Sequence, residues 1–289
     1  MTSETQALHT NAWCYLNLNN PVCAWAAYRG VLVQAPLEPG FLTVWMASML
    51  SANGSERLAR EFALEAVRAR MFSDHVSRLR GMYVFIDERS AKRATAWGGP
   101  FVEANLTELN LAEARVGNQR YDSNWITHQP STAIDDSVIP DWMPRYWRGE
   151  PHPDHEPLWE VLAEGRLVLL GTELRRRAFE RIRTKFPNSL ALLETARLAA
   201  WVGSDLGNIS AFLRVDPTHV TLDYLLDMRS AGDKELKAKI ADLMRSGHPV
   251  NRTAIGSSLS IGAFVTPDLR PYGFRRPHGE MRYVLSAKP

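Results

Sequence analysis

Apolar and polar residues are arranged along the first half of the chain in a way that predicts both strands and helices. Short apolar or alternating runs bounded by Gly, Pro or Asn are typical of strands. Such runs occur at residues 13–18, 28–34, 41–50, 82–86, 104–111 and 166–170. Helical spacing of apolar residues predicts a helix capped by Ser55 and another from Glu88 to Trp97 that is capped by Asp87.

From Thr172 onward the pattern has only the helical period. Thr172 is a suitable N-cap residue, and Pro187 marks the end of the first helix in this part. Further helices are predicted at residues 190–202, 203–213, 221–229 and 233–245. The pattern therefore predicts an α+β domain over residues 11–171, followed over residues 172–289 by an α-helical domain with an irregular C-terminal arm.

Composition limits the class of partner. Hydrophobic residues make up 45% of the chain and charged residues 23%, which is ordinary for a globular protein. The net charge of +2 is too small to create a field that attracts nucleic acid or anionic lipid over the whole surface. The first helix of the second part is rich in arginine. It is either a solvated face or a surface for nucleic acid or an acidic partner.

Two cysteines, Cys14 and Cys23, are too few for a disulfide framework and lie among apolar residues. They are expected to be reduced and buried, which favours a cytoplasmic location. The N-terminal residues lack the pattern of a secretory signal, and no apolar run is long enough to cross a bilayer. No membrane partner is therefore expected, although export of an effector without a signal stays open.

The stretch from Ser77 to Trp97, SRLRGMYVFIDERSAKRATAW, combines a Ser-Arg pair, a strand with Tyr83, and an Ala-rich helix that ends at an aromatic residue. It resembles the ADP-ribosyltransferase superfamily, in whose poly-ADP-ribose polymerase branch a G-I-Y-F strand precedes a similar helix. The longer block from Leu58 to Asp87 also resembles a family of uncharacterised bacterial domains assigned to that superfamily. The resemblance covers roughly residues 11–170.

The resemblance implies a split-sheet domain over residues 11–171 that binds NAD in a cleft. It implies that Tyr83 and Trp97 flank the nicotinamide ring and that Ser77 and Arg78 hold ribose or phosphate. No Gly-rich dinucleotide signature is present, so NAD would be bound outside a Rossmann site.

Two further segments complete the expected cofactor site. The resemblance places a ribose-binding His or Arg on the first strand, where this chain offers Tyr15 or Asn17, with Arg29 the nearest arginine downstream. Asp122 belongs to an unusual polar and aromatic cluster, RYDSNWI, that could line the cleft.

Glu160 stands in E-V-L, before Glu164-Gly165 and the strand that follows. In ADP-ribosyltransferases the catalytic glutamate commonly has this placement. The resemblance therefore implies that Glu160 is catalytic, with Tyr83 as its partner in the site. It implies transfer of ADP-ribose from NAD to a protein or nucleic-acid acceptor, with release of nicotinamide, by a bacterial toxin or effector.

Other interpretations of the same residues are open. Tyr83 and Trp97 suit a hydrophobic core, and Glu160 suits an exposed helix end. The protein is then a non-catalytic interaction module of a phage-related or toxin–antitoxin assembly. A third possibility is an NAD glycohydrolase, in which water is the acceptor. His152, Asp154 and His155 have no spacing typical of a zinc site, so no metal is expected.

Overall fold

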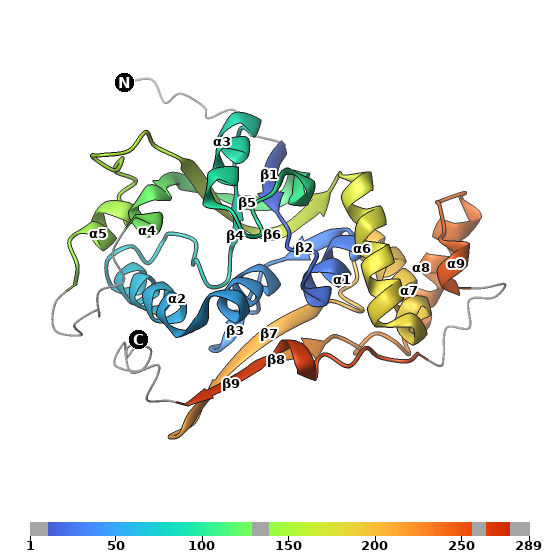
Figure 1. Cartoon of the computed structure of the whole chain (residues 1–289). Helices are drawn as coiled ribbons and strands as arrows, with labels where there is room; N and C mark the ends of the chain where they lie inside the picture. The colour runs from blue at the N-terminus through green and yellow to red at the C-terminus, as the bar shows by residue number, and fades with distance from the viewer. Residues whose placement is uncertain (1–10, 129–138, 256–263, 278–289) are drawn as a thin grey trace.

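The computed structural model describes residues 11–128, 139–255 and 264–277, which form two antiparallel sheets with helices around them (Figure 1). The first sheet has the strand order β1-β5-β6-β2, and β4 also pairs with β6. Its strands are β1 (Asn11–Tyr15), β2 (Val31–Val33), β4 (Met82–Val84), β5 (Leu106–Asp122) and β6 (Trp159–Leu169). The second sheet has the order β3-β7-β8-β9, with β3 (Phe41–Leu42), β7 (Ile209–Val215), β8 (His219–Leu226) and β9 (Phe274–Pro277).

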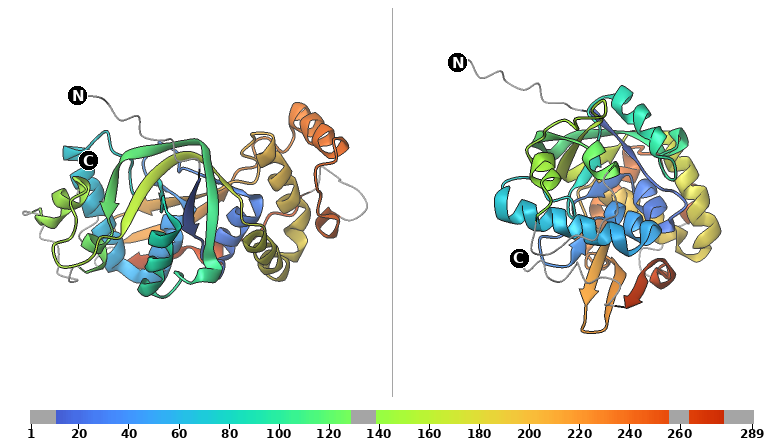
Figure 2. Two further views of the ribbon diagram at one scale, coloured as in Figure 1. Left: turned by 90° about the horizontal axis from the view of Figure 1, so that it is seen from above. Right: turned by 60° about the vertical axis from the view of Figure 1, so that its left-hand side comes forward.

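Two helices of the first half organise the hydrophobic core. Helix α1 (Pro21–Arg29) packs with the first sheet on one side and with α6 (Thr172–Lys185) and α7 (Leu190–Trp201) on the other. Helix α2 (Val44–Met71) lies between the sheets, because its buried Met46, Leu50 and Leu58 share one cluster with residues of β6, β7 and β8. Figure 2 shows this layering from two further directions.

The other helices are short or lie at the edges. They are α3 (Glu88–Arg93), α4 (Asn124–Thr127), α5 (Trp142–Trp147), α8 (Lys234–Arg245) and α9 (Arg252–Ile255). Four 3₁₀ turns complete the described elements: η1 (Ala94–Trp97), η2 (Glu103–Asn105), η3 (Pro187–Ser189) and η4 (Arg270–Tyr272).

Local signals predicted the centre of the chain well. β4 lies within the predicted strand, and Asp87 caps α3 by accepting a hydrogen bond from the backbone N–H of Ser90 at 2.7 Å. Asp233 likewise caps α8. The N-cap of α6 is Gly171 rather than Thr172, so the helix begins where predicted but without the expected side-chain bond.

Three N-terminal predictions differ from the structure. The predicted strand 28–34 is right for residues 31–33, which form β2, but residues 28 and 29 belong to α1, which Asn20 caps and Gly30 ends with a φ of 84°. Most of the predicted strand 41–50 belongs to α2, so Ser55 does not start that helix. The apolar run fits either period, and the cap at Thr43, which accepts from the N–H of Met46, decides for a helix.

The all-helical second part is also wrong, because residues 209–226 form the hairpin of β7 and β8. Alternate residues of β7 are buried, which is the period of a strand, and Asp216 closes the turn by accepting from the N–H groups of Thr218 and His219. β3 pairs with β7, so the second sheet joins the two halves of the chain.

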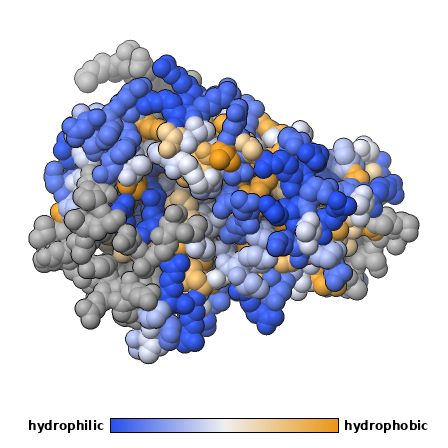
Figure 3. Space-filling model, viewed as in Figure 1, coloured by the Kyte–Doolittle hydropathy of each residue, from blue (hydrophilic) through white to orange (hydrophobic). Residues whose placement is uncertain are grey.

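The surface seen in Figure 3 is mainly hydrophilic, with apolar residues scattered over it. The arginines of α6 contribute to this character, and two of them pair with glutamates of the same helix, Arg176 with Glu173 and Arg183 with Glu180. Within the described residues, no helix combines the length and the apolar character that crossing a membrane requires.

Candidate functional site

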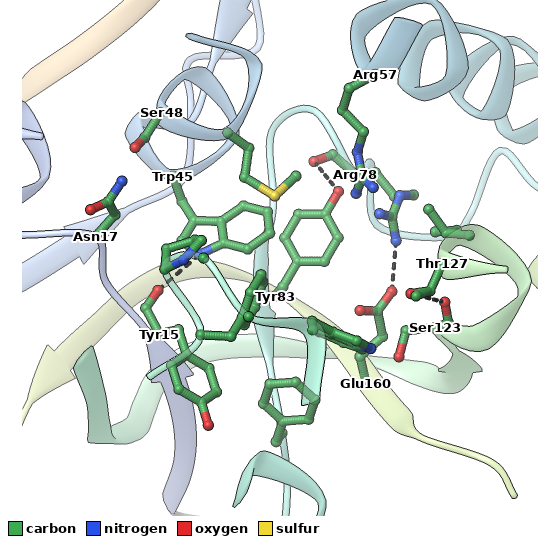
Figure 4. A pocket seen from close by; sticks show the side chains of 18 of the residues that line it. Tyr15, Asn17, Trp45, Ser48, Arg57, Arg78, Tyr83, Ser123, Thr127 and Glu160 are labelled. Carbon is green, nitrogen blue, oxygen red and sulfur yellow. Dashed lines mark hydrogen bonds and ion pairs between the residues drawn. The ribbon is translucent and has the colours of Figure 1, made fainter. Parts of the chain in front are cut away.

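A cavity of about 400 Å³ opens where α2 faces β4, β6 and the turn after η1 (Figure 4). One part of its wall is aromatic and the other is rich in arginine. Its lining residues come from β1, α1, α2, β4, η1, α4, β6 and the segments between them. Those used below are Tyr15, Cys23, Trp45, Arg57, Arg60, Arg78, Tyr83, Trp97, Phe101, Ile126 and Glu160.

Five of the residues predicted for the site line this cavity, although they are scattered over the first half of the chain. They are Tyr15, Arg78, Tyr83, Trp97 and Glu160, and Asn17, the alternative to Tyr15 in the prediction, lines the cavity as well. Tyr83 is paired with Leu162 across β4 and β6. Glu160 lies two residues from Leu162 on β6, so its side chain is on the same face of the sheet as Tyr83.

Three predicted site residues serve the fold instead, and the structure corrects their assignment. Arg29 is buried at the end of α1, where it donates hydrogen bonds to the carbonyl oxygens of Ser204 and Leu206. Asp122 is fully buried and accepts from the backbone N–H groups of residues 124, 152 and 158, which holds the loop that leads into β6. Ser77 donates to Glu65 at 2.9 Å and does not reach the cavity wall.

A buried network of charges holds Glu160. Arg78 donates Nε–H to Glu61 Oε2 at 2.8 Å and Nη2–H to Glu61 Oε1 at 3.0 Å, a two-pronged pair. Its remaining nitrogen, Nη1, donates to Glu160 Oε1 at 2.7 Å and to the Tyr146 hydroxyl. Tyr146 in turn donates to the same Oε1 at 2.9 Å, so one carboxylate oxygen of Glu160 has two donors.

The second oxygen of Glu160, Oε2, accepts no hydrogen bond from any residue in the described part of the chain. Arg78 and Tyr146 therefore fix the carboxylate through one oxygen and leave the other for a ligand. Arg57 reaches the far side of the network, where its Nη2 lies 2.7 Å from Glu61 Oε1.

Burial and charge determine which groups of the network are ionised. Burial by itself raises the pKa of Glu61, but the charges of Arg78 and Arg57 and the hydrogen bonds that they donate outweigh it and lower the pKa to about 2. Burial raises the pKa of Tyr83 and of Tyr146 well above the ordinary value, so both hydroxyl groups keep their protons. Tyr146 can therefore act only as a donor to Glu160.

The aromatic wall has a different arrangement from the predicted ring clamp. The ring of Tyr83 is already packed by two partners. The Trp45 ring stacks on it with 4.2 Å between the ring centroids, and the Arg78 guanidinium carbon lies 4.3 Å from the Tyr83 centroid. Trp45 is held by a hydrogen bond from its Nε1–H to the carbonyl oxygen of Tyr15. Trp97 packs edge-on against Phe101 at 4.8 Å and is only half-buried.

Glu65 and Arg68 of α2 form a clamp that holds the loop before β4 in place. Glu65 accepts hydrogen bonds from Ser77 and Arg68, and Arg68 donates to the carbonyl oxygens of Ser73 and His75. The clamp holds the loop that carries Arg78 into the network.

Two other sets of side chains, a cysteine and a histidine cluster, are of types that often react or bind metal, but neither forms a reactive centre here. Cys23 touches the cavity, but burial raises the pKa of its thiol to about 11, so a thiolate nucleophile is not formed at neutral pH. His128, His152 and His155 lie close together, and the rings of His128 and His155 are stacked with 3.8 Å between their centroids. Within the ranges that the structure describes, no set of three or more candidate ligands is arranged to hold a metal ion.

Sequence reasoning missed Trp45, Arg57 and Tyr146. Trp45 was hidden because the run 41–50 was interpreted as a strand, whereas Arg57 lay in the predicted helix after Ser55 but belonged to no motif that pointed to a site. Continuing the helical period back from Leu58 to Leu50 and Met46 would have shown that one helix carries both. Tyr146 lies in a Pro-rich segment with no periodic signal.

Residues 42–176 match the model of a family described as "Protein of unknown function (DUF2441)". The match covers just under half of the chain and contains Arg57, Arg78, Tyr146 and Glu160, but it does not include Tyr15. No curated protein has a significant match to the chain.

The low pKa of Glu61 makes stability depend on pH. Its folded pKa of about 2 is below the ordinary value of 4.5, so its ionised form stabilises the fold at neutral pH, and this contribution is lost as pH falls from about 4.5 to about 2. The contribution is on the order of 3 kcal/mol. We expect the unfolding free energy of Glu61→Gln, measured by denaturant titration, to depend much less on pH in this window. An equally steep dependence in the variant would show that other groups cause it.

Proposed function

We propose that this protein binds NAD in the cavity and transfers ADP-ribose to a macromolecular acceptor with release of nicotinamide. The observation that carries the proposal is the convergence on one cavity of five residues predicted from the ADP-ribosyltransferase resemblance: Tyr15, Arg78, Tyr83, Trp97 and Glu160. The volume of about 400 Å³ is within the usual range of small-molecule sites.

Glu160 is the group assigned to the chemistry. The bond between the anomeric carbon and the nicotinamide nitrogen breaks, its electron pair leaves with the nicotinamide, and positive charge develops on the ribose. The free Oε2 of Glu160 stabilises that charge as it forms. The acceptor then forms the new bond to the anomeric carbon and gives up its proton, which the carboxylate of Glu160, the one acidic side chain among the described lining residues, can accept.

The aromatic wall supplies orientation. Because the Tyr83 ring is packed between Trp45 and Arg78, we assign contact with the nicotinamide ring to Trp45 and Trp97. Tyr83 then supports Trp45 from behind and donates to the carbonyl oxygen of Arg78 at 3.1 Å. Holding the ring fixes the direction of the bond that breaks.

The test is incubation of the purified protein with NAD labelled in the adenosine part, alone and with a cell lysate. The proposal expects release of nicotinamide and label on a macromolecular fraction. Label found only in free ADP-ribose would identify water as the acceptor and the protein as a glycohydrolase. The absence of both nicotinamide release and thermal stabilisation by NAD would favour a non-catalytic interaction module.

A further inference from the structure

One basic group of the cavity belongs to the network only through Glu61 and makes no hydrogen bond or ion pair with Glu160. Arg57 extends from α2 into the cavity wall, and its Nη2 pairs with Glu61 at 2.7 Å. Its Nε is buried and has no hydrogen-bond partner among the described residues. A buried guanidinium N–H without an acceptor is unfavourable, so this position is suited to an acceptor on a ligand.

The charges around Arg57 favour an anion. Among the described lining residues, Arg57, Arg60 and Arg78 oppose a single carboxylate, that of Glu160. Glu61, behind the wall, is shared by Arg57 and Arg78. The described lining residues thus include three arginines and one carboxylate in a partly buried place, where electrostatic attraction is stronger than in water.

Arg57 and Arg60 are three residues apart on α2, so they lie on neighbouring turns of one helix face. Arg60 is held in place by donating Nη1–H to the carbonyl oxygen of Ile126 at 2.9 Å. Arg78 is not available, because its Nε, Nη1 and Nη2 are all used inside the protein. The open donor of this wall is thus on Arg57, with Arg60 as its neighbour.

We propose that Arg57, assisted by Arg60, forms a phosphate subsite at the α2 end of the cavity. The ligand class is a phosphate or diphosphate oxyanion on a molecule whose ring lies at the aromatic wall. A guanidinium with a free N–H edge matches such an oxyanion by charge and geometry. The inference rests on the proposed function in taking the diphosphate of NAD as the natural ligand, but the subsite can be tested without any turnover.

The experiment is calorimetric titration of inorganic pyrophosphate, ADP and nicotinamide into wild type, Arg57→Gln and Arg57→Lys. We expect Arg57→Gln to bind ADP and pyrophosphate about 10- to 100-fold more weakly, since one charge-assisted hydrogen bond is lost. Arg57→Lys keeps the charge and should lose less. Nicotinamide binding should be the same in all three proteins.

Arg176→Gln on α6 is the matched control, because it removes one exposed arginine that pairs with a glutamate of its own helix and lies away from the cavity wall. Equal weakening by Arg176→Gln, or no binding of ADP and pyrophosphate to wild type, would overturn the subsite. If Arg57→Gln does not fold, Arg60→Gln takes its place, with weaker ADP binding expected and an unchanged affinity counting against the subsite.

ADP binding that depends on Arg57 in a protein that does not cleave NAD would refute the proposed function alone. NAD cleavage with ADP binding indifferent to both arginines would refute the subsite alone.

Discussion

Glu160→Gln is expected to lower the rate of NAD turnover by about 10²–10³-fold while changing NAD affinity little. The substitution keeps the size of the side chain and a carbonyl oxygen that can accept from Arg78 and Tyr146. It removes the charge, whose effect falls on the developing oxocarbenium ion rather than on bound NAD. The measurement is nicotinamide release under saturating NAD, together with titration of NAD into both proteins.

Glu164→Gln is the control for this effect. Glu164 lies on the same strand, is partly exposed, and pairs with Arg115 outside the cavity. Its variant should keep wild-type turnover. Unchanged turnover in a folded Glu160→Gln protein would remove Glu160 from the chemistry and leave the cavity as a binding site only.

The second large effect concerns stability. Arg78→Met is expected to lower the unfolding free energy by about 3–5 kcal/mol, because buried Glu160 loses its ion pair and buried Glu61 keeps only Arg57. Glu61 is fully buried and Arg78 is 1% exposed, so solvent cannot replace the lost interaction. Urea unfolding of wild type and variant, followed by circular dichroism, measures the difference.

Two further proteins make this prediction specific. Arg115→Met breaks an ion pair whose arginine is 60% exposed and should cost only about 0–1 kcal/mol. The double variant Arg78→Met, Glu61→Gln should recover part of the loss, because it neutralises a carboxylate that Arg78 no longer balances. A double variant no more stable than Arg78→Met would show that packing, not charge, explains the effect.

Together, these expectations describe a site in which one arginine serves both fold and chemistry. Arg78 balances Glu61 in the core and orients Glu160 at the cavity. Under the proposed function, variants of Arg78 are therefore expected to lose activity for two reasons at once. Tyr146 offers a cleaner probe of orientation, because it contacts Glu160 Oε1 through one hydroxyl, whereas its stacked neighbour Tyr121 contacts His75 instead.

Local chemistry explains which parts of the fold were predictable from sequence. The strand of Tyr83 and the helix capped by Asp87 are specified by neighbouring residues, so sequence alone indicated both. The family resemblance predicted Glu160 and Arg78 as site residues, and both line the cavity. Their ion pair was not predicted, since the two residues are 82 positions apart and nothing in either segment indicates the contact.

The errors have physical causes as well. The start of α2 is apolar on nearly all sides because it lies between two sheets, so it has no polar face, and its helical period can be traced only backwards from Leu58. The strands β7 and β8 carry buried residues at alternate positions, but their hairpin is joined through Asp216 and Pro217, a turn signal that the helical interpretation overlooked. Tertiary packing thus decided these elements more than local propensity did.

The pairing of early strands with late ones also sets the order in which the protein can fold during synthesis. β1 pairs with residues 106–110, β2 with residues 166–168, and β3 with residues 211 and 212. At ~5–20 residues per second, β3 would leave the ribosome roughly 10–30 s before its partner strand exists. Apolar strand edges are exposed throughout that interval, and they are sites of aggregation until they are paired. Yield in a heterologous host should therefore depend on chaperones that shield the nascent N-terminal half.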